Sequence, residues 1–93
     1  MVNCIVEMFG FALEESGLNR VTIELEKGSH LGDLIGRLRI KLPSLEGKVI
    51  VRGENRLVDR CTFNIDGLFY FDDMDIEIQE DCHIRLLTLA TGG

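Results

Sequence analysis

The sequence predicts an α+β domain in which a mixed sheet carries one main helix across one face. Three observations predict it: strand-like alternation near the start of the chain, one long helical pattern in the middle, and a continuous apolar run near the end. The chain has 93 residues, of which 45% are hydrophobic and 28% are charged. This balance is typical of a folded domain with a single core. We therefore expect residues 1–93 to form one domain.

The first elements are expected to be two strands separated by a short helix or turn. Residues 2–9 are β-rich, and alternation divides them between two faces of a sheet. Residues 11–16 contain helix formers and stop at a glycine, and residues 20–26 alternate as a half-buried strand does. One face of the first strand carries Val2, Cys4, Val6 and Met8, and the other carries Asn3, Ile5, Glu7 and Phe9.

The long helix is expected after the second strand. Apolar residues recur at helical spacing from Leu31 to Leu42, and Pro43 prevents the helix from continuing. Either Ser29 or His30 is in position to cap its start.

The pattern is weaker over residues 45–59. Residues 49–51 are apolar and β-branched, which predicts a short strand, and residues 52–56 are polar, which predicts a solvated loop.

Extended structure returns after this loop. Residues 61–65 alternate, Asp66-Gly67 is a turn signal, and residues 68–71 again favour an extended conformation. Residues 76–78 fit either a short strand or a turn of helix.

Residues 84–89 form an apolar run that fits a central strand. With one helix between them, the first and last strands are expected to pair in parallel, which is the arrangement of a β-grasp (ubiquitin-like) fold. Residues 90–93 would then leave the sheet as a flexible tail that spans about 13 Å when extended.

Charge and composition exclude several classes of function. The net charge of −6 repels phosphate backbones and anionic lipid, so we expect neither nucleic acid nor a membrane as partner. No basic-then-apolar leader is visible, which predicts a cytoplasmic protein. The three cysteines, Cys4, Cys61 and Cys82, include no C-x-x-C pair, which argues against a disulfide framework and a metal site. Adjacent Cys82 and His83 suggest a nucleophile, but neighbours on an extended segment point in opposite directions.

The most distinctive feature is the Gly92-Gly93 end. Two glycines without Cβ atoms make a thread thin enough for a narrow active-site channel. A carboxylate on Gly93 becomes a good electrophile only after another protein couples it to a leaving group such as AMP. A frayed end of no function is the plain alternative.

These residues resemble the ubiquitin-like sulfur carriers, which include the small subunit of molybdopterin synthase and the thiamine-pathway carrier (MoaD/ThiS-like proteins). The resemblance extends over nearly the whole chain. It is carried by Phe9 with Gly17 eight residues on, VTIEL at 21–25, GSHLGDLI at 28–35, IDG at 65–67 and LLTLATGG at 86–93.

The resemblance implies a protein substrate rather than an enzyme. An activating enzyme of the ubiquitin-activating type would use ATP and Mg²⁺ to adenylate Gly93, with Gly92 as the thin approach, and this chain would bind no cofactor or metal itself. A sulfur donor protein would then supply a thiocarboxylate for cofactor biosynthesis, most simply of the molybdopterin type. The acceptor would be an enzyme such as a synthase large subunit.

Partner-binding residues are expected on the sheet face opposite the helix. Alternation turns Ile5, Phe9, Leu87 and Leu89 outward together, and an exposed apolar patch usually marks a partner site. The family's contacts imply Phe9, Leu87 and either Leu68 or Phe69, and the approach to the tail adds Leu89 and Thr91. A face covered by loops is the alternative. For the whole chain, the alternatives are a ubiquitin-like modifier, a non-activated binding module, and an enzyme in its own right.

Overall fold

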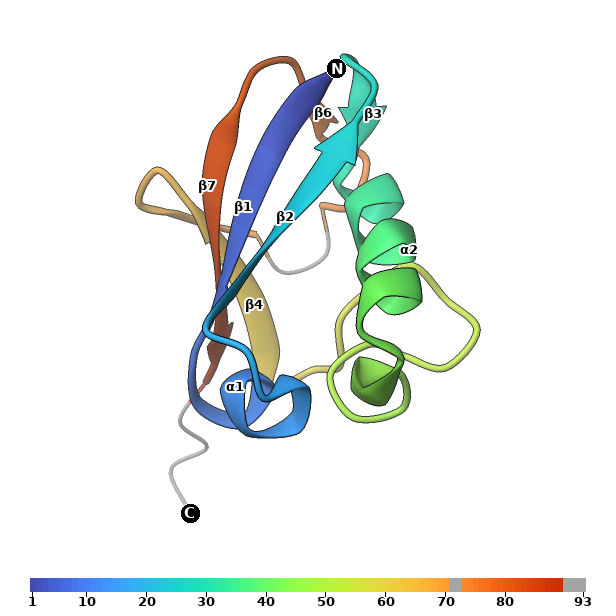
Figure 1. Ribbon diagram of the computed structural model, residues 1–93, viewed down its shortest axis with the longest axis vertical. Helices are drawn as coiled ribbons and strands as arrows, with labels where there is room; N and C mark the ends of the chain where they lie inside the picture. The colour runs from blue at the N-terminus through green and yellow to red at the C-terminus, as the bar shows by residue number, and fades with distance from the viewer. Residues whose placement is uncertain (71–72, 90–93) are drawn as a thin grey trace.

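The computed structural model, which describes residues 1–70 and 73–89, is a five-stranded mixed sheet with helix α2 packed across one face (Figure 1). The elements are β1 (Val2–Met8), α1 (Gly10–Ser16), β2 (Arg20–Leu25), β3 (Ser29–His30), α2 (Leu31–Lys41), the 3-10 turn η1 (Pro43–Leu45), β4 (Cys61–Ile65), β5 (Leu68–Tyr70), β6 (Glu77–Ile78) and β7 (Cys82–Thr88).

The strand order is β2-β1-β7-β4-β5, with β7 between β1 and β4. The first and last strands pair in parallel, and the other neighbours in this sheet pair antiparallel. The predicted β-grasp fold is therefore confirmed. A parallel connection needs a crossover, and α2 lies within it.

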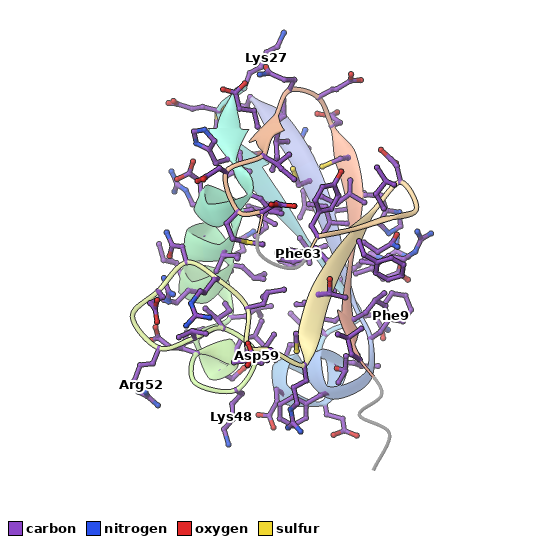
Figure 2. All side chains as sticks on the ribbon, turned by 180° about the vertical axis from the view of Figure 1, so that it is seen from behind. Phe9, Lys27, Lys48, Arg52, Asp59 and Phe63 are labelled. Carbon is purple, nitrogen blue, oxygen red and sulfur yellow. The ribbon has the colours of Figure 1, made fainter. Side chains whose placement is uncertain are left out.

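The two faces of the central strands divide as predicted. On β1 the residues Val2, Cys4, Val6 and Met8 are buried, and on β7 the residues Ile84 and Leu86 are fully buried. With the buried side of α2, they form the core. Phe63 of β4 lies between the sheet and α2 (Figure 2) and is fully buried.

Helix α2 begins and ends for the reasons its sequence suggests. His30 is its N-cap, and its backbone N–H donates to Asp33 Oδ2 at 2.8 Å. Leu34, Ile35 and Leu38 are fully buried on the side facing the sheet. Pro43 opens the turn that follows, since it cannot continue the helix.

Helix α1 depends on glycine at both ends. Gly10 has φ +57° and Gly17 has φ +71°, both in the left-handed region. Gly17 ends the helix, and its N–H donates to the Leu13 carbonyl at 2.9 Å. This short helix packs against β7 and η1, so it supports the end of the central strand.

The prediction of a strand at residues 49–51 is wrong. Val49 and Ile50 are fully buried, but Ile50 forms only isolated bridges, with Glu46 and with Leu57. The segment folds back on itself instead of joining the sheet. Arg39 of α2 holds it through Glu46, whose carboxylate lies 2.7 Å from Nε.

A second pairing in the structure was not predicted. β3 and β6 form a two-stranded sheet in which Ser29 pairs with Ile78. The sequence of residues 76–78 fits either a short strand or a turn of helix, and the structure shows a strand over Glu77–Ile78.

At the edge of the main sheet that β2 forms, Lys41 Nζ donates to the carbonyl of Thr22 at 3.0 Å.

Within residues 1–70 and 73–89, neither helix is long and apolar enough to cross a membrane.

Candidate functional site

The predicted reactive end, Gly92-Gly93, follows a strand whose end is held by hydrogen bonds to two other segments. β7 ends at Thr88, whose Oγ1 accepts the backbone N–H of Phe11 at 3.0 Å. The next residue, Leu89, donates its N–H to the Arg60 carbonyl at 2.6 Å. The chain is therefore held on both sides, by α1 and by the segment before β4, up to Leu89.

Residues 90–93 lie outside the described residues, and the roles predicted for Thr91, Gly92 and Gly93 therefore stay predictions. The same holds for the expected flexibility of this segment.

The Arg60 side chain makes a second contact beside its backbone hydrogen bond with Leu89. Its guanidinium lies over the ring of Phe11, 5.2 Å from the centroid, within the range of a cation–π contact. This contact ties α1 to the segment that precedes β4.

The sheet face turned away from α2, here called the outer face, carries the apolar residues that alternation predicted. Phe9 follows β1 in an extended conformation, and its N–H donates to the Leu86 carbonyl at 3.1 Å. Since Met8 pairs with Leu86, Phe9 falls beside Leu87. Phe9 is 37% exposed and lies on the side of the sheet away from α2 (Figure 2). Leu87 and Leu89 are half-buried.

The strand register separates the two candidates on β5. Phe69 pairs with Asn64, which pairs with Arg85, so Phe69 belongs to the outer face. Leu68 pairs with Ile65, a residue of the opposite face. Both are exposed, Leu68 by 62% and Phe69 by 53%. The structure thus places Phe69 on the same face as Leu87, in line with Asn64 and Arg85, and places Leu68 on the other face.

Polar side chains lie beside these apolar residues of the outer face. His83 Nε2 lies 2.8 Å from Glu7 Oε1 across the β1–β7 pair. Thr62, opposite Leu87, is buried, and its hydroxyl donates to the Tyr70 carbonyl at 2.9 Å. A partner would therefore meet apolar side chains near the end of β7 and the hydrogen-bonded His83 and Glu7 side chains further along the same strands.

The outer face is not covered by the loop after α2. That loop lies on the α2 side of the sheet (Figure 1), where Arg39 contacts Glu46 and Asn55. The alternative in which residues 45–59 cover the predicted partner surface is therefore wrong.

The adjacent Cys82 and His83 do not form a catalytic pair. His83 is opposite Ile5 and bonds to Glu7 on the outer face, whereas Cys82 is opposite Cys4 on the core side. The alternation argument predicted this separation. Burial raises the pKa of the third thiol, Cys61, which is only 3% exposed, so it is suited to packing more than to reaction.

The described residues also contain no group of three or more His, Cys, Asp or Glu side chains placed to hold a metal ion.

Comparison of the fold with solved structures finds small β-grasp proteins over the whole chain. SAMP1 from Haloferax volcanii superposes with a TM-score of 0.82 at 19% identity, covering 98% of this chain and 99% of that one. The small archaeal modifier protein 1 from Methanosarcina acetivorans has a TM-score of 0.78 at 19% identity, with 100% and 98% covered.

A Pyrococcus furiosus protein assigned as molybdopterin converting factor subunit 1 has a TM-score of 0.76 at 17% identity, with 97% and 100% covered. The likeness expected to ubiquitin-like sulfur carriers is thus confirmed at the level of the fold. No protein-family model and no curated protein sequence matches the chain.

Proposed function

We propose that this chain is a sulfur carrier whose Gly93 carboxylate is adenylated by an ATP-dependent activating enzyme and then converted to a thiocarboxylate. The observation that carries the proposal is the position of β7. It is the central strand, it ends at Thr88, and it leads directly into the Gly92-Gly93 tail. A rigid domain with its last strand directed into a thin tail is suited to presenting that tail to another protein's active site.

The proposed chemistry divides between the chain and its partner. A Gly93 carboxylate oxygen attacks the α-phosphate of ATP and displaces pyrophosphate, and the activating enzyme supplies the metal ion and cationic groups that stabilise the charge. A sulfur donor protein then replaces AMP with sulfur. The thiocarboxylate sulfur is a better nucleophile than the oxygen of the parent carboxylate, so sulfur passes to the acceptor without release as free sulfide. This chain contributes the substrate and binds no cofactor of its own.

The outer face is the proposed docking surface for the activating enzyme and for an acceptor enzyme such as a synthase large subunit. Phe9, Leu87 and Leu89 lie near the end of β7, and Phe69 lies on the same face, across β4 from Arg85. A partner that covered these residues would hold the domain while the tail entered its active site. The molybdopterin converting factor subunit 1 among the structural neighbours supports a molybdopterin-type pathway as the destination, and we propose that the chain acts in the cytoplasm.

Incubation with an activating enzyme, ATP, Mg²⁺ and a sulfur source tests the proposal. We expect intact-mass spectrometry to detect exchange of one oxygen for sulfur on the C-terminal peptide. A chain lacking Gly93 should show no exchange and should unfold at the same urea concentration as the full chain, because the tail lies beyond the last strand. Exchange in the chain lacking Gly93 would contradict the proposal.

A protein modifier is the second candidate, and the modifier proteins among the structural neighbours favour it. Both functions begin with the same activated Gly93 and differ in the acceptor. If the chain is a modifier, the same incubation with lysine-bearing proteins should yield an isopeptide to Gly93 in place of the thiocarboxylate. Tryptic peptides with a branched remnant of residues 86–93 on the modified lysine would identify it, because Arg85 is the last tryptic site of the chain.

A further inference from the structure

The two cysteines at the parallel β1–β7 pair lie side by side. Cys4 and Cys82 are direct register partners, although they are 78 residues apart in the chain. Neighbouring strands are about 4.8 Å apart, which lies inside the Cα separation that a disulfide accepts. The Cys82 thiol is 3.3 Å from Cys4 Sγ. Closing that gap to a bond needs a movement of roughly 1.3 Å, on the scale of a small χ1 rotation.

The surroundings give the two thiols different roles. Cys4 is fully buried in the core, whereas Cys82 is partly exposed and lines a cleft of about 290 Å³. Cys82 is therefore the thiol that a small molecule can reach. Cys4 can be reached only by Cys82.

The ionisation of the pair follows the same division. When Cys82 is a thiolate, the Cys4 S–H donates to it, and this hydrogen bond lowers the pKa of Cys82 against the opposing effects of burial and of Asp66 and Asp81. The same hydrogen bond, followed by burial, raises the pKa of Cys4. The exposed thiol is thus the more nucleophilic one at neutral pH.

Acidic side chains decide which oxidants can enter the cleft. Its walls include Asp66, Glu77, Glu80 and Asp81 beside Cys82. Asp81 is fixed there because its Oδ1 accepts the backbone N–H of Asn3 at 2.8 Å. Anionic oxidants, including acidic low-molecular-weight disulfides, are repelled. A small neutral peroxide is not.

We propose that Cys4 and Cys82 are the site of a reversible intramolecular disulfide that forms when a neutral peroxide oxidises the chain. The Cys82 thiolate attacks one oxygen of hydrogen peroxide, the O–O bond breaks, and hydroxide leaves, so that Cys82 becomes a sulfenic acid. Cys4 Sγ then attacks Cys82 Sγ and expels the second oxygen as water with the Cys4 proton. Two thiols lose two electrons in total, and one peroxide becomes two molecules of water. A dithiol reductant reverses the bond by thiol–disulfide exchange.

The modification would act on stability and leave the docking surface free. The pair lies on the core side of the sheet, and the outer face carries the neighbouring His83 instead. A bond that closes a loop of this length restricts the unfolded chain strongly, so oxidation should raise Tm by on the order of 10 °C. This inference does not depend on sulfur transfer at Gly93.

Titration of the full-length chain with hydrogen peroxide tests the proposal. After denaturation and alkylation, the oxidised protein should retain one alkylatable thiol of its three cysteines, and non-reducing peptide mapping should join the Cys4 and Cys82 peptides. Dithiothreitol should restore all three. The matched control, Cys61→Ala, should still form the bond, because Cys61 lies near the other end of β7, opposite Thr88.

Single variants identify the order of the two steps. Cys4→Ala should leave a sulfenic acid on Cys82 that dimedone traps, and Cys82→Ala should leave Cys4 unmodified because of its burial. If Cys4→Ala fails to fold, peptide mapping of the wild-type chain decides the question alone. Three alkylatable thiols after oxidation would overturn the proposal, as would disulfides that link only separate molecules or that involve Cys61.

Discussion

Gly10 and Thr88 couple the start of α1 to the base of the predicted tail, and Gly10→Ala is the perturbation that measures this coupling. Gly10 has φ +57°, and a Cβ built there would lie 3.1 Å from Thr88 Oγ1 and 3.3 Å from Thr88 Cβ. The left-handed conformation alone costs alanine about 1 kcal/mol. The Thr88 side chain must also move, which weakens its hydrogen bond with the Phe11 N–H, worth about 1 kcal/mol more.

Gly17→Ala is the matched control. Gly17 has φ +71°, but nothing lies within 4 Å of a Cβ built there. Gly17→Ala should therefore lower the free energy of unfolding by only the cost of the left-handed conformation, about 1 kcal/mol. Gly10→Ala should lower it by about 2 kcal/mol, which corresponds to roughly 10 °C in Tm. Urea unfolding followed by circular dichroism measures both free energies of unfolding.

The background variant Thr88→Ala isolates the contact. With the hydroxyl removed, Gly10→Ala should cost less than it does in the wild-type background and approach the cost of Gly17→Ala, since only the conformational component and the contact with the Cβ at position 88 are left. Equal costs for the two glycine variants in the wild-type background would refute the reasoning. A cost of Gly10→Ala that Thr88→Ala leaves unchanged would do the same.

Three further outcomes are expected. Leu87→Asp should weaken binding to the activating enzyme by about 2 kcal/mol in titration calorimetry, whereas Ile40→Asp, at a 73% exposed position on α2, should bind normally; equal losses would remove the outer face as the docking surface. Gly92→Ala should unfold like the wild type but form the acyl-adenylate more slowly in a pyrophosphate-release assay, because its Cβ obstructs a channel sized for glycine; unchanged turnover would exclude that steric cause. Cys82, whose pKa is lowered by the Cys4 hydrogen bond, should react with iodoacetamide near pH 8 about tenfold faster than Cys61, whose pKa is raised by burial. Peptide-resolved labelling checks this order, and faster labelling of Cys61 would contradict it.

Alternation predicted the parts of the fold in which each strand has one buried side. Val6 and Ile84 are apolar neighbours in the structure, as expected for the core side of a parallel pair. Phe9 and Leu87 fall on the opposite side by the same rule. Period-two patterns carry this information because one-residue shifts would exchange the two faces.

Other features depend on contacts that no local pattern records. The apolar residues Val49 and Ile50 look like a strand, but they are buried by a loop that returns on itself under Arg39. The short pairing of Ser29 with Ile78 joins distant segments and has too few residues to show a period.

The thiol pair was missed for a different reason. The odd number of cysteines and the absence of a C-x-x-C pair argued against a disulfide framework, so reduced thiols were expected. The signal was present in the register: once Val6 is placed opposite Ile84, Cys4 must lie opposite Cys82. Combining the expected parallel pairing with residue counting along both strands would have found it.

The central position of β7 has a consequence for how the protein is made. Of the strands in the main sheet, β7 is synthesised last, yet it is the one that joins β1 to β4. Sheets whose central pairs are distant in sequence cannot close until both members are present. A chain interrupted during translation before Cys82 would leave β1 and β4 with unpaired edges and an open core, a target for proteases. Completion of the fold therefore follows synthesis of the last strand of this sheet, and a chain shortened before that strand would be open to proteolysis.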